Sequence, residues 1–166
     1  KGVKNGESPQ WLKDKLLAIG LRPISALVDI TNYMTIAYCR PLHVFDADKI
    51  KGNINIRMAK EGEKMLALDG KEYEMDGEMT VIADDQDAEA LAGVMGGERT
   101  GVSEDTVNVM LEAAYFDPIR TAMTGRKLNL QSDARFRFER GVDPAFLVDG
   151  TEIATQLILD LCGGEA

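Results

Sequence analysis

Hydrophobic residues recur at helical spacing near both ends of the chain. The first such segment begins at Ser8-Pro9, with Ser8 as the expected cap and Pro9 as the first helical residue, and ends near Gly20. Its apolar positions fall on one helix face: Leu12, Leu16, Leu17 and Ile19. The mostly apolar stretch 24–39 predicts a second helix, which Pro41 ends.

Between residues 43 and 116 the pattern changes to short segments typical of strands. Residues 53–58 alternate polar and apolar side chains, as a half-buried strand does. The pairs Asp69-Gly70 and Asp76-Gly77 favour tight hairpin turns. Further strands are predicted at 80–83, 90–94 and 107–116.

The last third of the chain returns to a helical pattern. Asp117-Pro118 and Asp143-Pro144 each predict a helix start, and the second opens a long helix that ends at Gly163. Strands in the middle with helices at both ends predict an α+β fold, with central antiparallel or mixed β segments, rather than alternating βαβ units. Because no internal repeat or low-complexity linker occurs, we expect one compact unit.

Composition fits a globular protein. The 166 residues are 45% hydrophobic and 28% charged, which excludes intrinsic disorder, and no apolar run approaches the roughly 18 residues of a membrane span. No signal peptide opens the chain and two distant cysteines define no disulfide scaffold, so we expect a cytoplasmic protein. Because the chain starts with Lys1, we expect it to be part of a longer protein.

Charge and the familiar motifs exclude several kinds of site. A net charge of −9 argues against nucleic-acid binding by bulk charge, and the single histidine, His43, excludes multi-histidine metal sites. Residues 96–101 have the glycine spacing of a phosphate-binding loop, but Val102 stands where the lysine belongs. The acidic run 84–87 lacks the glycine of a calcium loop.

One segment, 120–140, is basic within this acidic chain. It holds six cations against two carboxylates: Arg120, Arg126, Lys127, Arg135, Arg137 and Arg140 against Asp133 and Glu139. Such a segment suits contact with an RNA backbone, and it equally suits a solvated helix face with arginine–carboxylate pairs. The sequence leaves both interpretations open.

Five separated motifs in the same order resemble the editing module of the bacterial phenylalanyl-tRNA synthetase beta subunit. They are VDITNY (28–33), RPLHVFD (40–46), LAGVMGGE (91–98), LEAAYFDP (111–118) and RFERGVDP (137–144). The resemblance covers roughly residues 22–163. It implies a leading helical segment, 1–21, followed by one editing domain, 22–166.

The resemblance implies hydrolysis of tyrosyl-tRNA(Phe), a mischarged product in which one hydroxyl distinguishes the amino acid from phenylalanine. A site that hydrogen-bonds this hydroxyl can discriminate by roughly 10⁴ or more, whereas an apolar pocket rejects it weakly. Glu112 corresponds to the family's pocket glutamate and His43 to the histidine near the scissile ester. Outside that context, Glu112 would be an ordinary strand carboxylate and His43 a core histidine bonded to backbone.

Other site residues follow from the same resemblance. Arg22, Thr31 and Asn32 correspond to residues near the bound tRNA end, although a helix-end arginine and helix-to-turn hydrogen bonds explain them equally. Gly96 and Gly97 would let backbone approach the substrate, or form a tight turn. Ser132 and Ala134 correspond to positions that line the amino-acid pocket; the family often has threonine at the first, so Ser132 keeps the hydroxyl and loses a methyl.

The implied partners are the 3′ end of tRNA(Phe) carrying tyrosine, the remainder of the beta subunit and the alpha subunit in a heterotetramer, with no membrane. The resemblance implies no metal or cofactor in this fragment, since ATP and Mg²⁺ belong to aminoacylation by the complete synthetase. The general base is undetermined. The alternative function is a non-catalytic module of the same synthetase that docks the tRNA end or packs against another subunit.

Overall fold

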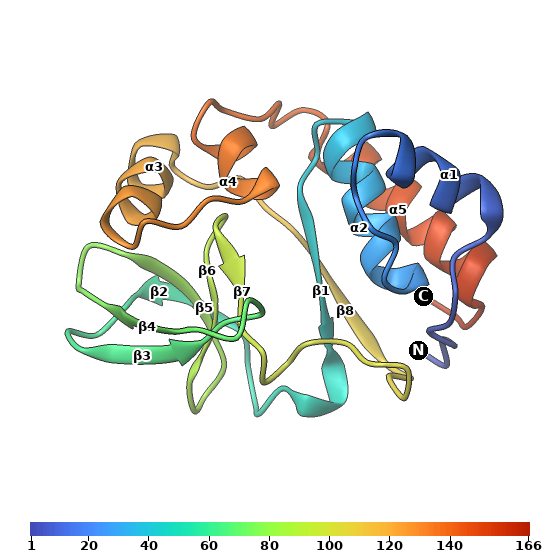
Figure 1. Ribbon diagram of the computed structural model, residues 1–166. Helices are drawn as coiled ribbons and strands as arrows, with labels where there is room; N and C mark the ends of the chain where they lie inside the picture. The colour runs from blue at the N-terminus through green and yellow to red at the C-terminus, as the bar shows by residue number, and fades with distance from the viewer. The chain divides into compact units, whose positions relative to one another are not determined.

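The computed structural model describes all 166 residues and has helices at both ends of the chain with strands between them (Figure 1). The helices are α1 (Gln10–Ala18), α2 (Ala26–Ala37), α3 (Pro118–Lys127), α4 (Asp133–Phe138) and α5 (Leu147–Cys162), with a 3-10 turn at Ala47–Lys49. The strands are β1 (Leu42–Asp46), β2 (Asn55–Met58), β3 (Glu63–Leu66), β4 (Glu72–Met75), β5 (Thr80–Ala83), β6 (Ala88–Leu91), β7 (Met95–Gly96) and β8 (Val109–Ala113). The predicted α+β class is confirmed, and every strand pair is antiparallel.

The chain divides into two compact units, each assembled from separate stretches. The first comprises residues 1–48, 102–114 and 143–166, and the second comprises 49–101 and 115–142. The partition into a leading segment, 1–21, and an editing domain, 22–166, stays a prediction. Within the first unit, residues 1–21 contribute side chains to the hydrophobic core.

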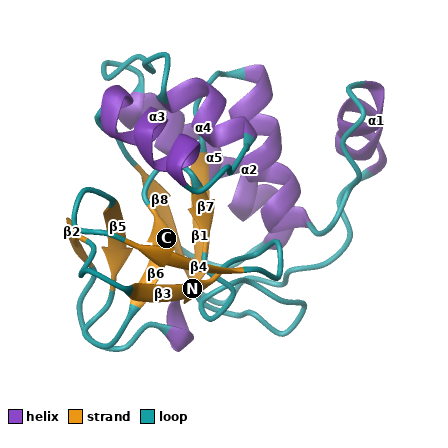
Figure 2. Ribbon diagram, turned by 60° about the vertical axis from the view of Figure 1, so that its left-hand side comes forward, coloured by secondary structure: helices purple, strands orange, loops and turns teal.

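In the first unit α2 and α5 pack against a two-stranded ribbon, β1–β8, and α1 packs against α2; Figure 2 draws the strands in orange. Its core side chains recur at helical spacing on α2, where Leu27, Ile30 and Met34 are fully buried. Strand β1 adds Val44, and α5 adds Ile158. The helical patterns of α2 and α5 therefore identified core residues, whereas on the first predicted face only Leu12 and Leu16 are buried and Leu17 and Ile19 are exposed.

Two helix starts in this unit differ from the prediction. The Ser8 hydroxyl donates a buried 2.6 Å hydrogen bond to the Asp29 carboxylate instead of capping α1, which begins at Gln10. The Asp143 carboxylate accepts from the Ala145 backbone N–H in a turn that precedes α5, so this helix begins at Leu147. Both side chains are diverted from the predicted cap by another partner.

The second unit contains a four-stranded sheet of order β2-β5-β6-β7, the hairpin β3–β4 and the helices α3 and α4. The start of α3 was predicted correctly: the Asp117 carboxylate accepts from the Arg120 backbone N–H, and Pro118 is the first helical residue. The Asp69-Gly70 turn joins β3 to β4 as predicted. The Asp76-Gly77 hairpin was wrong, because β4 and β5 lie in different sheets.

Strand boundaries shifted where tertiary contacts intervene. The strand predicted at 53–58 begins at Asn55, and it is not half-buried, since Ile56 is 58% exposed. The strand predicted at 90–94 is Ala88–Leu91, and Gly93 follows it in a turn with φ +70°. The strand predicted at 107–116 is limited to Val109–Ala113. The bounds of β1, β3, β4, β7 and α4 were not predicted from the sequence.

No helix in the structure combines the length and the apolar character needed to cross a membrane.

Gly97 is fixed by packing in the second unit. Its backbone N–H donates to the Glu89 carbonyl over 2.7 Å, and a Cβ at this position would lie 2.7 Å from the same oxygen. We expect Gly97→Ala to lower the free energy of unfolding by about 2 kcal/mol, since backbone must move to relieve the clash. Urea denaturation measures this. The control is Gly77→Ala, whose Cβ would be 4.0 Å from its nearest neighbour; equal effects of the two would contradict the packing argument.

Candidate functional site

His43 and Glu112 are direct partners in the β1–β8 ladder. Side chains of paired residues in an antiparallel ladder lie on the same face, with Cβ atoms about 4.5–5.5 Å apart. Leu42 and Val44 alternate with His43 along β1 and join the helical core, as does Leu111 on β8. The imidazole and the carboxyl group therefore share the face of the ribbon opposite to that core.

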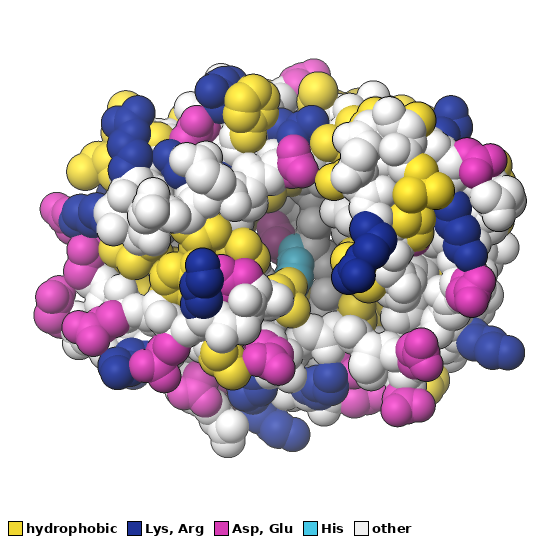
Figure 3. Space-filling model, viewed as in Figure 1, with side chains coloured by type: hydrophobic (Ala, Val, Ile, Leu, Met, Phe, Trp, Pro, Cys, Tyr) yellow, Lys and Arg dark blue, Asp and Glu magenta, His cyan; other side chains and the backbone are white.

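The His43 imidazole is half-buried and uncharged at neutral pH. Burial lowers its pKa from the usual 6.5 to about 4. Its Nε2 atom is buried without a hydrogen-bond partner, and its ring packs edge-on against Phe45 with 4.4 Å between ring centroids. Figure 3 shows the single cyan side chain visible at the surface. Because no backbone group bonds this imidazole, it can still accept or donate a hydrogen bond to a ligand.

The Glu112 side chain is half-buried and forms neither an ion pair nor a hydrogen bond within the protein. Burial raises its pKa from 4.5 to about 7. At neutral pH the carboxyl group therefore exists in both protonation states, and either state can accept a hydrogen bond from a hydroxyl group. With His43, it forms a pair of polar groups whose hydrogen-bonding capacity the fold leaves unused.

Three other predicted site residues lie in the same unit. Thr31, on α2, is buried, and its hydroxyl donates to the Val28 carbonyl over 2.8 Å. Asn32 follows on the same helix and is half-buried. Arg22 is exposed in the segment between α1 and α2. The Thr31 hydroxyl therefore bonds within α2 rather than from the helix to a turn, and substrate roles for these three residues stay predictions.

The remaining predicted residues lie in the second unit. The Ser132 hydroxyl donates to the Val94 carbonyl over 2.6 Å and accepts from the Arg135 backbone N–H, which caps α4. Ala134 is half-buried in that helix, and Gly96 belongs to β7. The bond from Ser132 to Val94 brings the motif at 91–98 next to α4, a proximity the sequence did not reveal.

The basic segment 120–140 is mostly paired. Lys127 contacts Asp76 and Glu78, while Arg137 bonds Asp133. Arg135 is buried, pairs with Glu139 and donates to the Leu130 carbonyl. Arg140 also pairs with Glu139, and its guanidinium lies over the Phe136 ring. Arg120 donates to the Glu78 carbonyl. Pairs with carboxylates are thus present for Lys127, Arg135, Arg137 and Arg140, whereas Arg120 bonds a backbone carbonyl, and contact of the segment with RNA stays an open interpretation. Figure 3 likewise shows basic and acidic side chains mixed over the surface.

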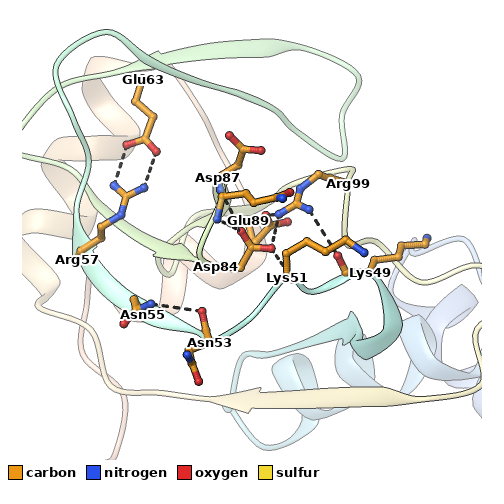
Figure 4. A network of polar contacts seen from close by, with 11 residues as sticks. Lys49, Lys51, Asn53, Asn55, Arg57, Glu63, Asp84, Asp87, Glu89 and Arg99 are labelled. Carbon is orange, nitrogen blue, oxygen red and sulfur yellow. Dashed lines mark hydrogen bonds and ion pairs between the residues drawn. The ribbon is translucent and has the colours of Figure 1, made fainter.

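A buried polar network stabilises the second unit around Asp84 (Figure 4). Burial opposes ionisation of Asp84, but backbone N–H groups of Asp87, Lys51 and Gln86, together with Arg99, outweigh it and hold the pKa at about 2. Arg99 also pairs with the fully buried Glu89. These bonds occupy the carboxylate oxygens of Asp84, the first residue of the acidic run 84–87. No group of three or more His, Cys, Asp or Glu side chains is arranged to hold a metal ion.

The fold and the paired residues define an α+β domain in which a buried acid and an imidazole face the same side of a β ribbon. The chain belongs to the B3/4 domain family, whose sequence model matches residues 1–163. The resemblance seen in the five motifs is thereby confirmed at the level of the family.

Similar proteins agree with this membership. The chain is 68% identical over its full length to the "Phenylalanine--tRNA ligase beta subunit" of Paramagnetospirillum magneticum, and 63% identical to that of Ruegeria pomeroyi. It spans 21% of the length of each. A solved N-terminal fragment of the phenylalanyl-tRNA synthetase beta subunit from Pyrococcus horikoshii is 16% identical, with a TM-score of 0.46 over 66% of this chain and 36% of that one.

Phe45 packs against His43 and was not predicted from the sequence as a site residue. Its alternation with His43 along one strand was the available signal, but the pattern alone does not distinguish a ring at the site from an ordinary core residue.

The two shifted pKa values predict opposite effects on stability. Glu112 has a folded pKa of about 7 against 4.5 unfolded, so its contribution to stability falls as the pH rises across this window. His43 has a folded pKa of about 4 against 6.5, so its contribution rises between these values. Glu112→Gln removes only the contribution that falls with pH. We therefore expect the free energy of unfolding of the variant, relative to that of the wild type, to be about 2 kcal/mol higher at pH 8 than at pH 5.

Denaturant unfolding at the two pH values measures this difference. The control is Glu152→Gln, at an exposed position of α5 in the same unit. A stability difference between Glu112→Gln and wild type that is the same at pH 5 and pH 8 would contradict the burial of the Glu112 carboxyl group.

Proposed function

We propose that this chain is the hydrolytic editing module of a phenylalanine–tRNA ligase and that it cleaves tyrosyl-tRNA(Phe). The observation that carries the proposal is the pairing of His43 with Glu112 on one face of the β1–β8 ribbon. Membership of the B3/4 family and the similarity to phenylalanine–tRNA ligase beta subunits support the choice of reaction.

Glu112 is proposed to recognise the phenolic hydroxyl of tyrosine. Its carboxyl group has no hydrogen bond within the protein and sits where burial already disfavours charge. A tyrosyl group supplies the missing donor, whereas a phenylalanyl group covers the carboxyl without pairing it. A hydrogen bond to a charged group contributes about 1.5–3 kcal/mol, and leaving a buried charged group unpaired costs at least as much. The gain for tyrosine and the penalty for phenylalanine together give a preference for the tyrosyl ester of two or more powers of ten.

His43 is proposed to act at the ester. A water oxygen attacks the carbonyl carbon, the bond from this carbon to the ribose oxygen breaks, and the ribose oxygen takes a proton while tyrosine leaves as the free acid. A neutral imidazole suits the orientation of that water or a hydrogen bond to the leaving oxygen. Because an aminoacyl ester is already activated, positioning supplies much of the rate and the proposal names no general base.

The other assignments follow the family resemblance. In the first unit, Arg22, Thr31 and Asn32 are proposed to contact the tRNA end. In the second unit, the proposed contacts with the substrate come from Gly96, Gly97, Ser132 and Ala134.

The proposed partners are the tRNA(Phe) 3′ end with tyrosine, the remaining beta subunit and the alpha subunit. We propose that this chain needs no cofactor, that ATP and Mg²⁺ serve aminoacylation in the complete ligase, and that both reactions occur in the cytoplasm.

Replacing Glu112 tests the selectivity. In the ligase that carries this chain, we expect Glu112→Ala to slow hydrolysis of tyrosyl-tRNA(Phe) at least tenfold and to narrow its ratio to phenylalanyl-tRNA(Phe), because the penalty on phenylalanine also disappears. Glu112→Gln falls between, since the amide oxygen still accepts one hydrogen bond. Single-turnover deacylation rates of both esters at one salt concentration give the ratio, with Glu152→Gln as a matched exposed control. A wild-type ratio preserved in Glu112→Ala would remove Glu112 from hydroxyl recognition.

Replacing His43 tests the chemical step. We expect His43→Ala to lower the single-turnover rate of tyrosyl-tRNA(Phe) hydrolysis by about tenfold or more while formation of phenylalanyl-tRNA(Phe) by the same ligase is unchanged. Unchanged deacylation would exclude the imidazole from the site. If both Glu112→Ala and His43→Ala leave deacylation intact, the non-catalytic docking function replaces the proposal.

A further inference from the structure

Arg40 is the largest fully buried side chain of the chain, with 1% of its surface exposed. It lies in the connection between α2 and β1. Its Nη1 atom donates to the Ala114 carbonyl over 3.1 Å, and its Nη2 atom donates to the Asp143 carbonyl. Ala114 directly follows β8, and Asp143 lies just before α5. One guanidinium group therefore connects three segments of the first unit.

The fold makes room for this side chain. Gly150 is buried inside α5, where glycine weakens a helix relative to alanine. A Cβ at Gly150 would lie 3.1 Å from the Arg40 Cγ atom and 3.2 Å from the Phe146 ring. The absence of a side chain at Gly150 is thus what admits the arginine stem between β1 and α5.

The position of Arg40 matters because a two-stranded ribbon is marginally stable by itself. At the far end, the Thr106 hydroxyl donates to the Asp46 carboxylate over 2.8 Å and thereby ties the chain before β8 to the end of β1. At the near end, the last ladder pair is Leu42 with Ala113, and the guanidinium of Arg40 holds the next carbonyl. The pair of His43 with Glu112 is the second from this near end.

We propose that Arg40 is a positioning residue of the editing site: by holding the Ala114 and Asp143 carbonyls it keeps the Glu112 carboxyl group aligned with the His43 imidazole. The inference rests on the proposed function.

The hydrogen bonds of Arg40 favour a geometric role over a stabilising one. Burial lowers the pKa of the guanidinium, and the charge of Asp143 partly offsets this effect. Both hydrogen bonds of the Arg40 side chain go to neutral carbonyl oxygens. A buried cation held in this way adds little to stability that an apolar side chain of equal size would not. The planar fork of arginine reaches two carbonyls at fixed geometry, which the single ammonium of lysine does not.

The test uses the complete ligase with three substitutions in this chain. Arg40→Lys keeps the positive charge but loses the planar guanidinium that donates to two carbonyls at once. Gly150→Ala keeps every donor but pushes the Arg40 stem. Thr151→Ala, at the adjacent residue of α5, removes only a hydroxyl bonded to the Leu147 carbonyl and is the matched control. For each variant, single-turnover deacylation of tyrosyl- and phenylalanyl-tRNA(Phe), phenylalanine aminoacylation, and deuterium exchange of peptides covering β1 and β8 are measured.

We expect Arg40→Lys and Gly150→Ala to narrow the tyrosyl-over-phenylalanyl deacylation ratio by about tenfold, since small misplacements of reacting groups have effects of this size. In both variants deuterium exchange in β8 should be faster, and the rate of aminoacylation should stay within about twofold of the wild-type rate. The deacylation ratio of the control, Thr151→Ala, should also stay within about twofold of the wild-type ratio. Two results overturn the proposal: a ratio unchanged in both variants, or equal slowing of both esters together with aminoacylation, which marks a purely structural role.

Failure of the proposed function is recognised separately, from the wild-type ligase. If it hydrolyses the tyrosyl ester no faster than the phenylalanyl ester, the editing function falls before any variant is compared, and the positioning role falls with it. A clear wild-type preference that survives in Arg40→Lys and Gly150→Ala rejects Arg40 alone.

Discussion

The antiparallel pairing of β1 with β8 is the constraint on which the rest of the first unit depends. Leu42, Val44 and Leu111 bury their side chains against the helices, and strand geometry then forces the alternate residues onto the other face. A slip of one residue in register would expose the apolar set and bury the polar one. Burial of aliphatic side chains therefore fixes where His43 and Glu112 lie, although neither contributes to that core.

The same burial decides the protonation of the pair. The pKa of His43 falls to about 4 and that of Glu112 rises to about 7, so each is pushed toward its uncharged form. An uncharged imidazole and a half-charged carboxyl group keep their hydrogen-bonding capacity for a neutral ligand. A close, fully charged imidazolium–carboxylate pair would satisfy itself and leave less hydrogen-bonding capacity for a ligand.

Local signals predicted the local features of the fold, and tertiary contacts explain the failures. Asp117-Pro118 caps α3 as expected because its partner, the Arg120 N–H, lies three residues away. Ser8 was assigned to α1, but a distant residue, Asp29, binds its hydroxyl. The resemblance named His43 and Glu112, yet their pairing across the ribbon depends on a register that no local pattern encodes. The role of Arg40 was equally hidden, since both its acceptors are distant backbone carbonyls.

The candidate residues differ in how directly a substitution reports on substrate. The hydroxyl of Thr31 bonds within α2, and that of Ser132 caps α4, so removing either changes the helix before it changes any contact with tRNA. The backbone N–H of Gly97 donates to the Glu89 carbonyl, so a substitution there also changes the fold before it changes a contact with a ligand. The side chains of His43 and Glu112 form no hydrogen bond within the chain, so the fold does not need their polar groups. The polar groups of these two side chains can be replaced without breaking a hydrogen bond of the fold, which makes these two positions the ones where loss of activity is informative.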